Sequence, residues 1–260
     1  MINFETHNEL SLKITLECEG LSVHTKVGSM IGMQGEDADK PVKFTKELLG
    51  PTNGAGFIGA AFAQGLRRLT GENLPLMKAT SNGAAELYLA DQGAHVMVLQ
   101  LEEGESIYVE SENLLAFTDD CKYSVSFFGA GVISQGGLAK SKLTGRGENA
   151  FVAVTCVGNP IQLEGECVCD PDCFVVSTTK PSVGLDFGLK TLIGQSSGES
   201  YNLKFQSSDS VCIIQPYERR SGLSLSMDAG EEAEFNTADT SEAFEGVSNF
   251  LSGASRFFNR

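Results

Sequence analysis

Short apolar runs separated by turn residues fill the middle of the chain, between Leu74 and Gly129. The runs are Glu86–Ala90, Ala94–Leu101, Ser106–Glu110, Leu114–Thr118 and Tyr123–Phe128. In the last run Tyr123, Val125 and Phe127 alternate with serines, and a period of two is typical of a strand with one buried face. We therefore expect several short strands at close spacing, as in a β-sandwich, a barrel or a β-helix-like roll.

The same order of strands and turns returns further along the chain. Gly83–Ala90 matches Gly147–Val154, and Gly-Glu turns at Gly104 and Gly165 lead into similar apolar strands. A more divergent copy begins near Leu12–Leu16. A repeat of about 45–55 residues is typical of stacked copies of one supersecondary unit that share a core. The alternative is the chance self-similarity of any all-β chain.

Three other segments give local predictions. Alternation in Leu10–Val27, with Glu19-Gly20 as the turn, predicts a hairpin. Apolar spacing in Phe57–Leu69 predicts a helix, which Gly71 would end. The segment Gly131–Gly147 is rich in Gly, Ser and Lys and is interpreted as a connector.

The C-terminal part has a different character. Asp228–Glu245 holds seven acidic residues and no basic one, which is typical of an extended linker. From Ser241 to Arg260 apolar residues recur at helical spacing. The candidate interaction residues on this helix are Phe244, Val247, Phe250, Leu251, Phe257 and Phe258. Such a helix docks either into a groove on a partner or onto its own β body or a sister subunit.

These segments give a simple domain organisation. Residues 1–227 form a β domain, with repeats at about 1–50, 74–130 and 143–217. Residues 228–240 form the acidic linker, and residues 241–260 form the amphipathic helix.

The net charge and the cysteine content restrict which partners and which cellular environment we expect for this protein. A net charge of −15 repels phosphate backbones and anionic lipid, so we expect neither nucleic acid nor a membrane as a partner. The N-terminus lacks a signal-peptide pattern, and no apolar run reaches the roughly 18 residues of a transmembrane helix. The seven cysteines are odd in number and irregularly spaced, which favours reduced thiols in a cytoplasm.

Few residues suggest chemistry. Cys167, Cys169 and Cys173 form the sharpest cluster, and zinc would need a fourth ligand such as Cys156 or a histidine. Buried free cysteines in a β core are the favoured interpretation. His24 and His95 have no Ser or Cys at a recognisable spacing, and nucleophile-elbow, zinc-protease and phosphate-loop motifs are absent from the sequence. We assign no catalytic, cofactor or metal residues and expect a protein that is not an enzyme.

Several motifs resemble a known family. They are the Arg-x-x-Thr-Gly-Glu signature that ends at Glu72, the run Glu86–Ala116, and Gly198-Glu199 before a strand that ends in Gln215-Pro216. They are similar to the family named after altered inheritance of mitochondria protein 24, over roughly Leu10–Tyr217. The resemblance implies three double-stranded β-helix-like repeats with pseudo-threefold symmetry. It also implies a fold similar to the tryptophan RNA-binding attenuation protein, which binds tryptophan between subunits and RNA through basic residues; this acidic chain departs from that pattern.

The sequence therefore predicts an all-β protein with a non-enzymatic interaction or scaffold role. A protein partner or self-association through the C-terminal helix would serve that role, and exposed edge strands would favour a homo-oligomer. One alternative is a small-molecule binder with a pocket between repeats or subunits. Another alternative is a metal-dependent enzyme on a β-roll, which only the cysteine cluster supports.

Overall fold

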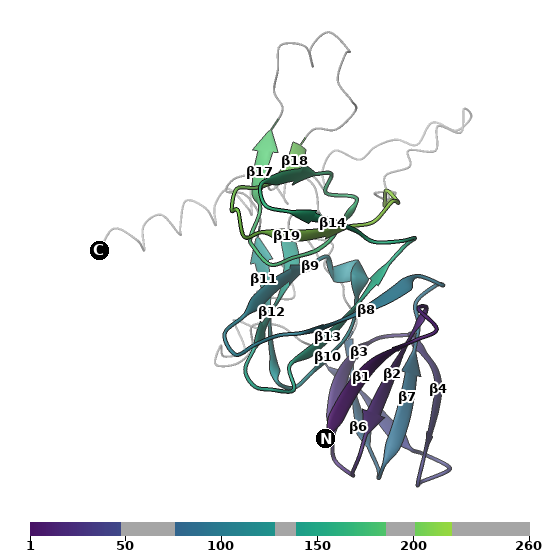
Figure 1. Ribbon diagram of the computed structural model, residues 1–260. Helices are drawn as coiled ribbons and strands as arrows, with labels where there is room; N and C mark the ends of the chain where they lie inside the picture. Colours follow the sequence, from purple (N-terminus) through teal and green to yellow (C-terminus); the bar gives the residue numbers. More distant parts are fainter. Residues whose placement is uncertain (48–75, 128–138, 186–200, 220–260) are drawn as a thin grey trace, which may run out of the picture. The chain divides into compact units, whose positions relative to one another are not determined.

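The computed structural model describes residues 1–47, 76–127, 139–185 and 201–219 (Figure 1). Among these residues the structure is all-β, as predicted, and the helical element is one short 3-10 helix, η1 (Ser111–Asn113). The helix expected at Phe57–Leu69 and the C-terminal helix expected at residues 241–260 lie outside the described residues.

The strands form four antiparallel sheets (Figure 1). The first sheet has the order β1 (Ile2–His7), β2 (Ser11–Leu16), β7 (Ala85–Leu89), β4 (Met30–Gly35). The second has the order β5 (Val42–Glu47), β6 (Leu76–Ser81), β3 (Ser22–Lys26), β10 (Leu114–Thr118), β13 (Phe151–Cys156), β8 (His95–Gln100). The third has the order β11 (Cys121–Phe127), β12 (Ala139–Gly145), β9 (Ser106–Val109), β16 (Phe174–Ser177), β19 (Val211–Ile214), β14 (Ile161–Glu164). The fourth has the order β15 (Cys167–Cys169), β18 (Tyr201–Phe205), β17 (Ser182–Leu185).

The strand order recurs at a step of six strands. The trio β5-β6-β3 has the same arrangement as β11-β12-β9 and β17-β18-β15. The trio β4-β7-β2 has the same arrangement as β10-β13-β8 and β16-β19-β14. Of the segments matched in the sequence, Gly83–Ala90 contains β7 and Gly147–Val154 covers the first four residues of β13, and these two strands are one step apart.

A β-bulge recurs at the same step. β4, β10 and β16 each have one residue without a partner on the neighbouring strand, namely Ile31, Leu115 and Val175. A bulge bends its strand and redirects the side chain at the extra residue. Its return at corresponding places means that the three strand pairs share a local geometry as well as a pairing order.

Buried apolar side chains form three clusters. Inward-facing residues of β2 and β7, such as Leu12, Ile14 and Leu87, lie in the first cluster. Residues of β9, β10 and β13 contribute most to the second, and residues of β16, β18 and β19 contribute to the third. Leu115 of β10 belongs to the first cluster and Val175 of β16 to the second. Each of these bulge residues therefore completes the core of the preceding group of strands.

Two local predictions were wrong. The hairpin expected over Leu10–Val27 does not form: β2 pairs with β1 and β7, whereas β3 pairs with β6 and β10 in another sheet (Figure 1). Alternation identified both strands, but their buried residues pack with side chains from distant segments. The connector expected over Gly131–Gly147 contains the strand β12. Its alternation of apolar and polar residues was not recognised, because the buried residue Lys140 is charged.

Candidate functional site

The described chain ends just before the segment that carries the predicted interaction residues. Phe244, Val247, Phe250, Leu251, Phe257 and Phe258 all lie outside the described residues. The segment Ser221–Arg260 forms a separate unit from Met1–Arg220. The structure therefore informs on the attachment point of this segment, where Arg219 is the last described residue.

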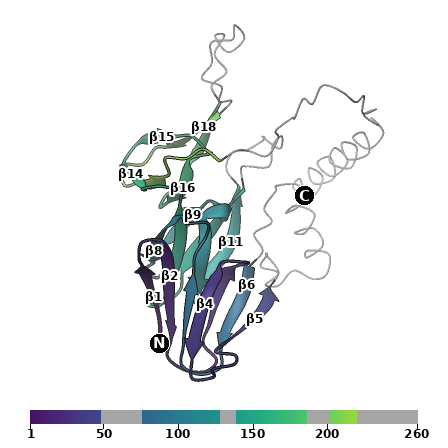
Figure 2. The ribbon, with the colours of Figure 1, turned by 90° about the vertical axis from the view of Figure 1, so that its right-hand side faces the viewer.

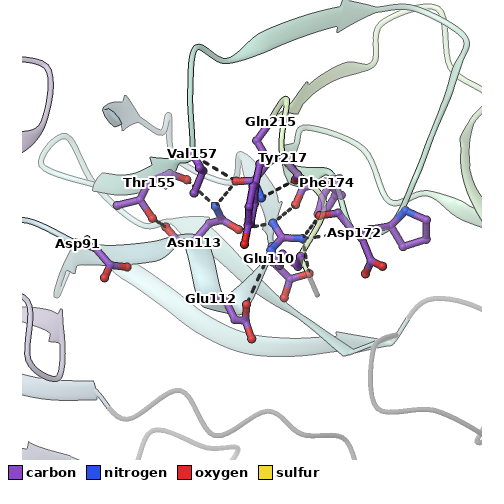
Figure 3. A network of polar contacts seen from close by, with 12 residues as sticks. Asp91, Glu110, Glu112, Asn113, Thr155, Val157, Asp172, Phe174, Gln215 and Tyr217 are labelled. Atoms are coloured by element: carbon purple, nitrogen blue, oxygen red, sulfur yellow. Dashed lines mark hydrogen bonds and ion pairs between the residues drawn. The ribbon is translucent and has the colours of Figure 1, made fainter. Parts of the chain in front are cut away.

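The guanidinium group of Arg219 binds to the β body, and its acceptors Asn113, Asp172 and Phe174 are labelled in Figure 3. Nη1 donates to the backbone oxygens of Pro171 at 3.3 Å and Asp172 at 3.0 Å. Nη2 donates to the backbone oxygen of Phe174 and to Oδ1 of Asn113. A planar guanidinium presents several donors in a fixed fork, so one side chain here holds the turn before β16 and the turn before β10 together.

Asn113 and Gln215 continue this network (Figure 3). Nδ2 of Asn113 donates to the backbone oxygen of Thr155 at 2.6 Å and to Oε1 of Gln215 at 3.2 Å. Nε2 of Gln215 donates to the backbone oxygen of Tyr217 at 3.1 Å, while Oε1 also accepts from the backbone of Val157. Both amides are buried. Their bonds tie η1 to β13 and to the end of β19, because buried polar groups need partners.

A buried ion pair lies beside Arg219. Lys140 of β12 donates through Nζ to Oε2 of Glu110, which follows β9, and Nη1 of Arg219 lies 3.8 Å from the same oxygen. Ser111 and Ser141 are in hydroxyl contact at 2.8 Å next to this pair. The carboxylate is therefore flanked by two cations, which compensates its removal from water.

Sequence reasoning missed this network. Glu110 is the last residue of the apolar run Ser106–Glu110, and Gln215 ends the strand that precedes Pro216. A polar residue at such a place is ordinarily expected to be exposed. Both side chains are buried. The available signal was weak: each polar residue continues a strand pattern by one position, immediately before a turn.

The cysteines of the predicted cluster lie in and beside the third core cluster. Cys169 is buried there with Cys212, and Cys167 packs against the same cluster. Burial raises the pKa of Cys173 to about 11, and a hydrogen bond with Cys169 raises the pKa of Cys212. A metal ligand must be a thiolate, so these shifts favour packing roles. Within the described ranges, no group of three or more His, Cys, Asp or Glu residues is arranged to hold a metal ion.

His24 lies in a compact polar contact with Asp119. Nε2 of His24 is 2.7 Å from Oδ1 of Asp119, and the hydroxyl of Ser22 donates to Oδ2 at 2.8 Å. The hydrogen bond from His24 lowers the pKa of Asp119. The imidazole also stacks on Phe117, with ring centroids 4.7 Å apart. Ser22 and His24 both contact the carboxylate, so His24 does not act as the base of Ser22 as a nucleophilic triad requires.

A hollow with an acidic lining is present in the group of strands β8–β13. Its lining includes Glu102 and Glu103, which follow β8, and Gly147-Glu148, which precedes β13. These residues lie in turns that connect strands between β8 and β13. The small-molecule alternative placed its pocket between repeats or subunits. With the repeat bounds predicted from the sequence, Glu102 and Glu103 fall in residues 74–130 and Gly147 and Glu148 in residues 143–217, so this hollow lies between two predicted repeats.

The described part of the molecule is thus an all-β protein whose buried polar groups join one strand group to the next. Among the residues that the structure describes, no helix combines the length and the apolar composition needed to cross a bilayer. Residues 4–216 match the family described as mitochondrial biogenesis AIM24, and the chain belongs to this family. The family resemblance predicted from the sequence is confirmed.

A solved structure has a similar fold. The crystal structure of protein SPYM3_0169 from Streptococcus pyogenes superposes with a TM-score of 0.59 at 22% sequence identity. The match covers 84% of this chain and 94% of the streptococcal chain. At this identity the likeness concerns the fold alone. Comparison with curated proteins gave no match.

Proposed function

We propose that this protein is a non-enzymatic scaffold that displays a C-terminal docking helix from a three-repeat β body. The recurrence of strand order and of the bulge supports three double-stranded β-helix-like repeats with pseudo-threefold symmetry. In this proposal the protein acts in the cytoplasm, its partners are proteins, and it uses no cofactor. The helix at residues 241–260 presents Phe244, Val247, Phe250, Leu251, Phe257 and Phe258 to a groove.

The observation that carries the proposal is the fastening of Arg219. Its guanidinium donates to carbonyl oxygens of Pro171, Asp172 and Phe174 and to the amide of Asn113. These acceptors lie on two turns of the body, so the chain leaves from a fixed point. A scaffold needs such a point, because a recognition segment on a secured tether samples a restricted volume around its body.

The polar contacts of the body support a non-enzymatic role. The carboxylates, amides and serines described above bond to one another across strands, with geometries that stabilise the fold. Arg219 lies beside the buried pair of Lys140 and Glu110, and the Ser22 hydroxyl donates a hydrogen bond to Asp119. Such groups are fixed for structure, and the acidic surface and the C-terminal segment are left for recognition.

The proposal is tested by removing the docking helix and, separately, only its apolar side chains. One variant deletes Asp239–Arg260, and the matched variant replaces Phe244, Leu251 and Phe258 by serine, which keeps length and charge. We expect both to unfold cooperatively at the wild-type midpoint and both to lose the same proteins in quantitative affinity capture. If the captured proteins are unchanged in both variants, the helix is not a docking element. If either variant unfolds without cooperativity, the segment is part of the core.

A ligand screen separates the two alternatives from the scaffold. Thermal shift of the full chain with amino acids reports on a small-molecule site, and thermal shift with divalent metals reports on a metal site, because a ligand that binds only the folded state raises the midpoint. We expect no shift in either arm. A saturable shift with one compound would replace the scaffold proposal by a binding function.

A further inference from the structure

Two strands lack a neighbour that their counterparts have. At a step of six strands, β10 lies between β13 and β3, and β16 lies between β19 and β9. Among the described residues, β4 has only β7 beside it (Figure 1), and β15 has only β18 (Figure 2). The neighbours of β10 and β16 that β4 lacks are β3 and β9. Because β3, β9 and β15 are equivalent at the step of six strands, the strand that would complete the edge beside β4 is one like β15. The first and last groups of strands therefore end in edges that correspond to the two sides of an internal junction.

The internal junctions define how these edges would pair. In the junction of β3 with β10, His24 lies opposite Phe117. In the junction of β9 with β16, Tyr108 lies opposite Ser177. Phe117 and Ser177 each lie two positions after the bulge residue of their strand, and the position two after Ile31 is Met33.

The opposite strand follows the same count. His24, Tyr108 and Val168 each lie seven positions before a bulge residue, namely Ile31, Leu115 and Val175. No insertion or deletion interrupts the count in any of the three segments. The corresponding junction therefore places Val168 of β15 opposite Met33 of β4.

Burial differs sharply between the open edge and the internal junctions. The bulge residues Leu115 and Val175 are both 0% exposed, because they enter the core clusters of the preceding strand group. Ile31, the bulge residue of β4, is 62% exposed, and its neighbours Met30 and Met33 are also exposed. On the other open edge Val168 is 55% exposed. Apolar side chains are thus exposed at the positions that internal junctions bury.

We propose that β15 of one copy of this chain pairs antiparallel with β4 of a second copy. Val168 then faces Met33, and Ile31 enters the third core cluster of the first copy, beside Phe174 and Phe205. The resulting sheet is β17-β18-β15-β4-β7-β2-β1, and its first six strands repeat the order of the internal six-stranded sheets. The interface is heterologous, so it propagates head to tail and produces either a ring or an open chain of copies.

A second copy fits these edges better than an unrelated partner. Each edge is the counterpart of the other, and one chain carries both. Strand β4 has the sequence Met-Ile-Gly-Met-Gln-Gly and contains no charge or proline, the features with which proteins protect an edge from pairing. The net charge of −15 opposes association at low ionic strength, so added salt strengthens the assembly.

The experiment is sedimentation of the full chain with one lysine placed on either edge. The variants are Ile31→Lys and Val168→Lys, and the matched control is Ile161→Lys, at another exposed isoleucine on an edge strand, β14. We expect wild type and the control to associate with rising concentration. Each edge variant should weaken association about tenfold or more, because the lysine charge would be buried without a partner. An equimolar mixture of the two variants should form dimers and nothing larger, since each supplies the edge that the other lacks.

Other outcomes overturn the proposal. A wild type that stays monomeric at every concentration and salt, or an effect of only one edge variant, contradicts head-to-tail pairing. The double variant Met33→Cys, Val168→Cys, made in a Cys18→Ser background, distinguishes pairing within one chain. After oxidation, a ladder of species on a non-reducing gel that Cys18→Ser alone lacks supports pairing between copies, whereas a cross-linked monomer shows closure within one copy. Deletion of Asp239–Arg260 should leave association unchanged; loss of association on deletion assigns it to the tail. The result is thus separable from the scaffold test, which measures capture of other proteins.

Discussion

Nζ of Lys140 and Oε2 of Glu110 form an ion pair beneath the surface, with only 4% and 8% of the two residues exposed. The lysine comes from β12 and the glutamate follows β9, so the pair reinforces the pairing of these two strands. Removing Lys140 leaves the Glu110 carboxylate in a medium of low polarity with only the more distant guanidinium of Arg219, 3.8 Å away, to compensate its charge. The pair is therefore the point at which a single substitution should be most damaging.

We predict that Lys140→Met destabilises the protein by about 3 kcal/mol. The double variant Glu110→Leu, Lys140→Met should recover most of this loss, because neither charge then remains buried. Urea unfolding of the full chain gives both values. Lys13→Met is the matched control: its ion pair with Glu86 lies at the surface, where such pairs contribute little. Equal effects of Lys140→Met and Lys13→Met would contradict the assignment of a buried pair.

Arg219 gives the second prediction. Arg219→Ala should destabilise the protein by about 2–3 kcal/mol, because several acceptors lose a charged donor. Arg219→Lys should restore only a minor part, since a single ammonium group cannot reach the turns before β10 and β16 together. Urea unfolding at neutral pH measures both, and Arg146→Ala, at an exposed position, should have almost no effect. A lysine variant as stable as wild type would show that charge alone matters.

The sequence identified strands better than it identified their partners. Alternation correctly located β2 and β11, because Leu12 or Tyr123 must face a core whatever strand lies beside it. It could not show that β2 pairs with β7, more than sixty residues later, since register depends on contacts that no local pattern encodes. The hairpin at Leu10–Val27 failed for this reason.

The polar network was hidden for a related reason. Glu110 and Lys140 each break an apolar pattern, and only their contact in three dimensions makes burial tolerable. The correspondence between β4 and β15 was equally invisible, because exposure of Ile31 becomes informative only when Leu115 and Val175 are seen buried. Composition and spacing predict strands, whereas these relationships depend on which strands meet.

Cysteine reactivity provides a third prediction. In the native protein iodoacetamide at neutral pH should modify the exposed Cys18 first. Cys121 and Cys173 should react slowly, because burial raises the pKa of each thiol to about 11 and the reactive thiolate is scarce. Peptide mass spectrometry over time gives the order, and in urea the same sites should react at similar rates. Fast modification of Cys173 in the native state would instead indicate an activated thiol.

Asp119 provides a prediction about pH. Hydrogen bonding from His24, with further help from Ser22 and Lys78, lowers the pKa of this carboxyl in the folded state. Since the unfolded value is about 3.9, the stabilisation is fully present above about pH 4 and is lost as the pH falls through the folded value. Asp119→Asn should therefore reduce the free energy of unfolding most at neutral pH, and its difference from wild type should shrink in acid. Urea unfolding at a series of pH values measures this difference, with Asp39→Asn at an exposed position as the control. A difference that stays constant from neutral pH into strong acid would show that the carboxylate charge of Asp119 does not stabilise the junction of β3 and β10.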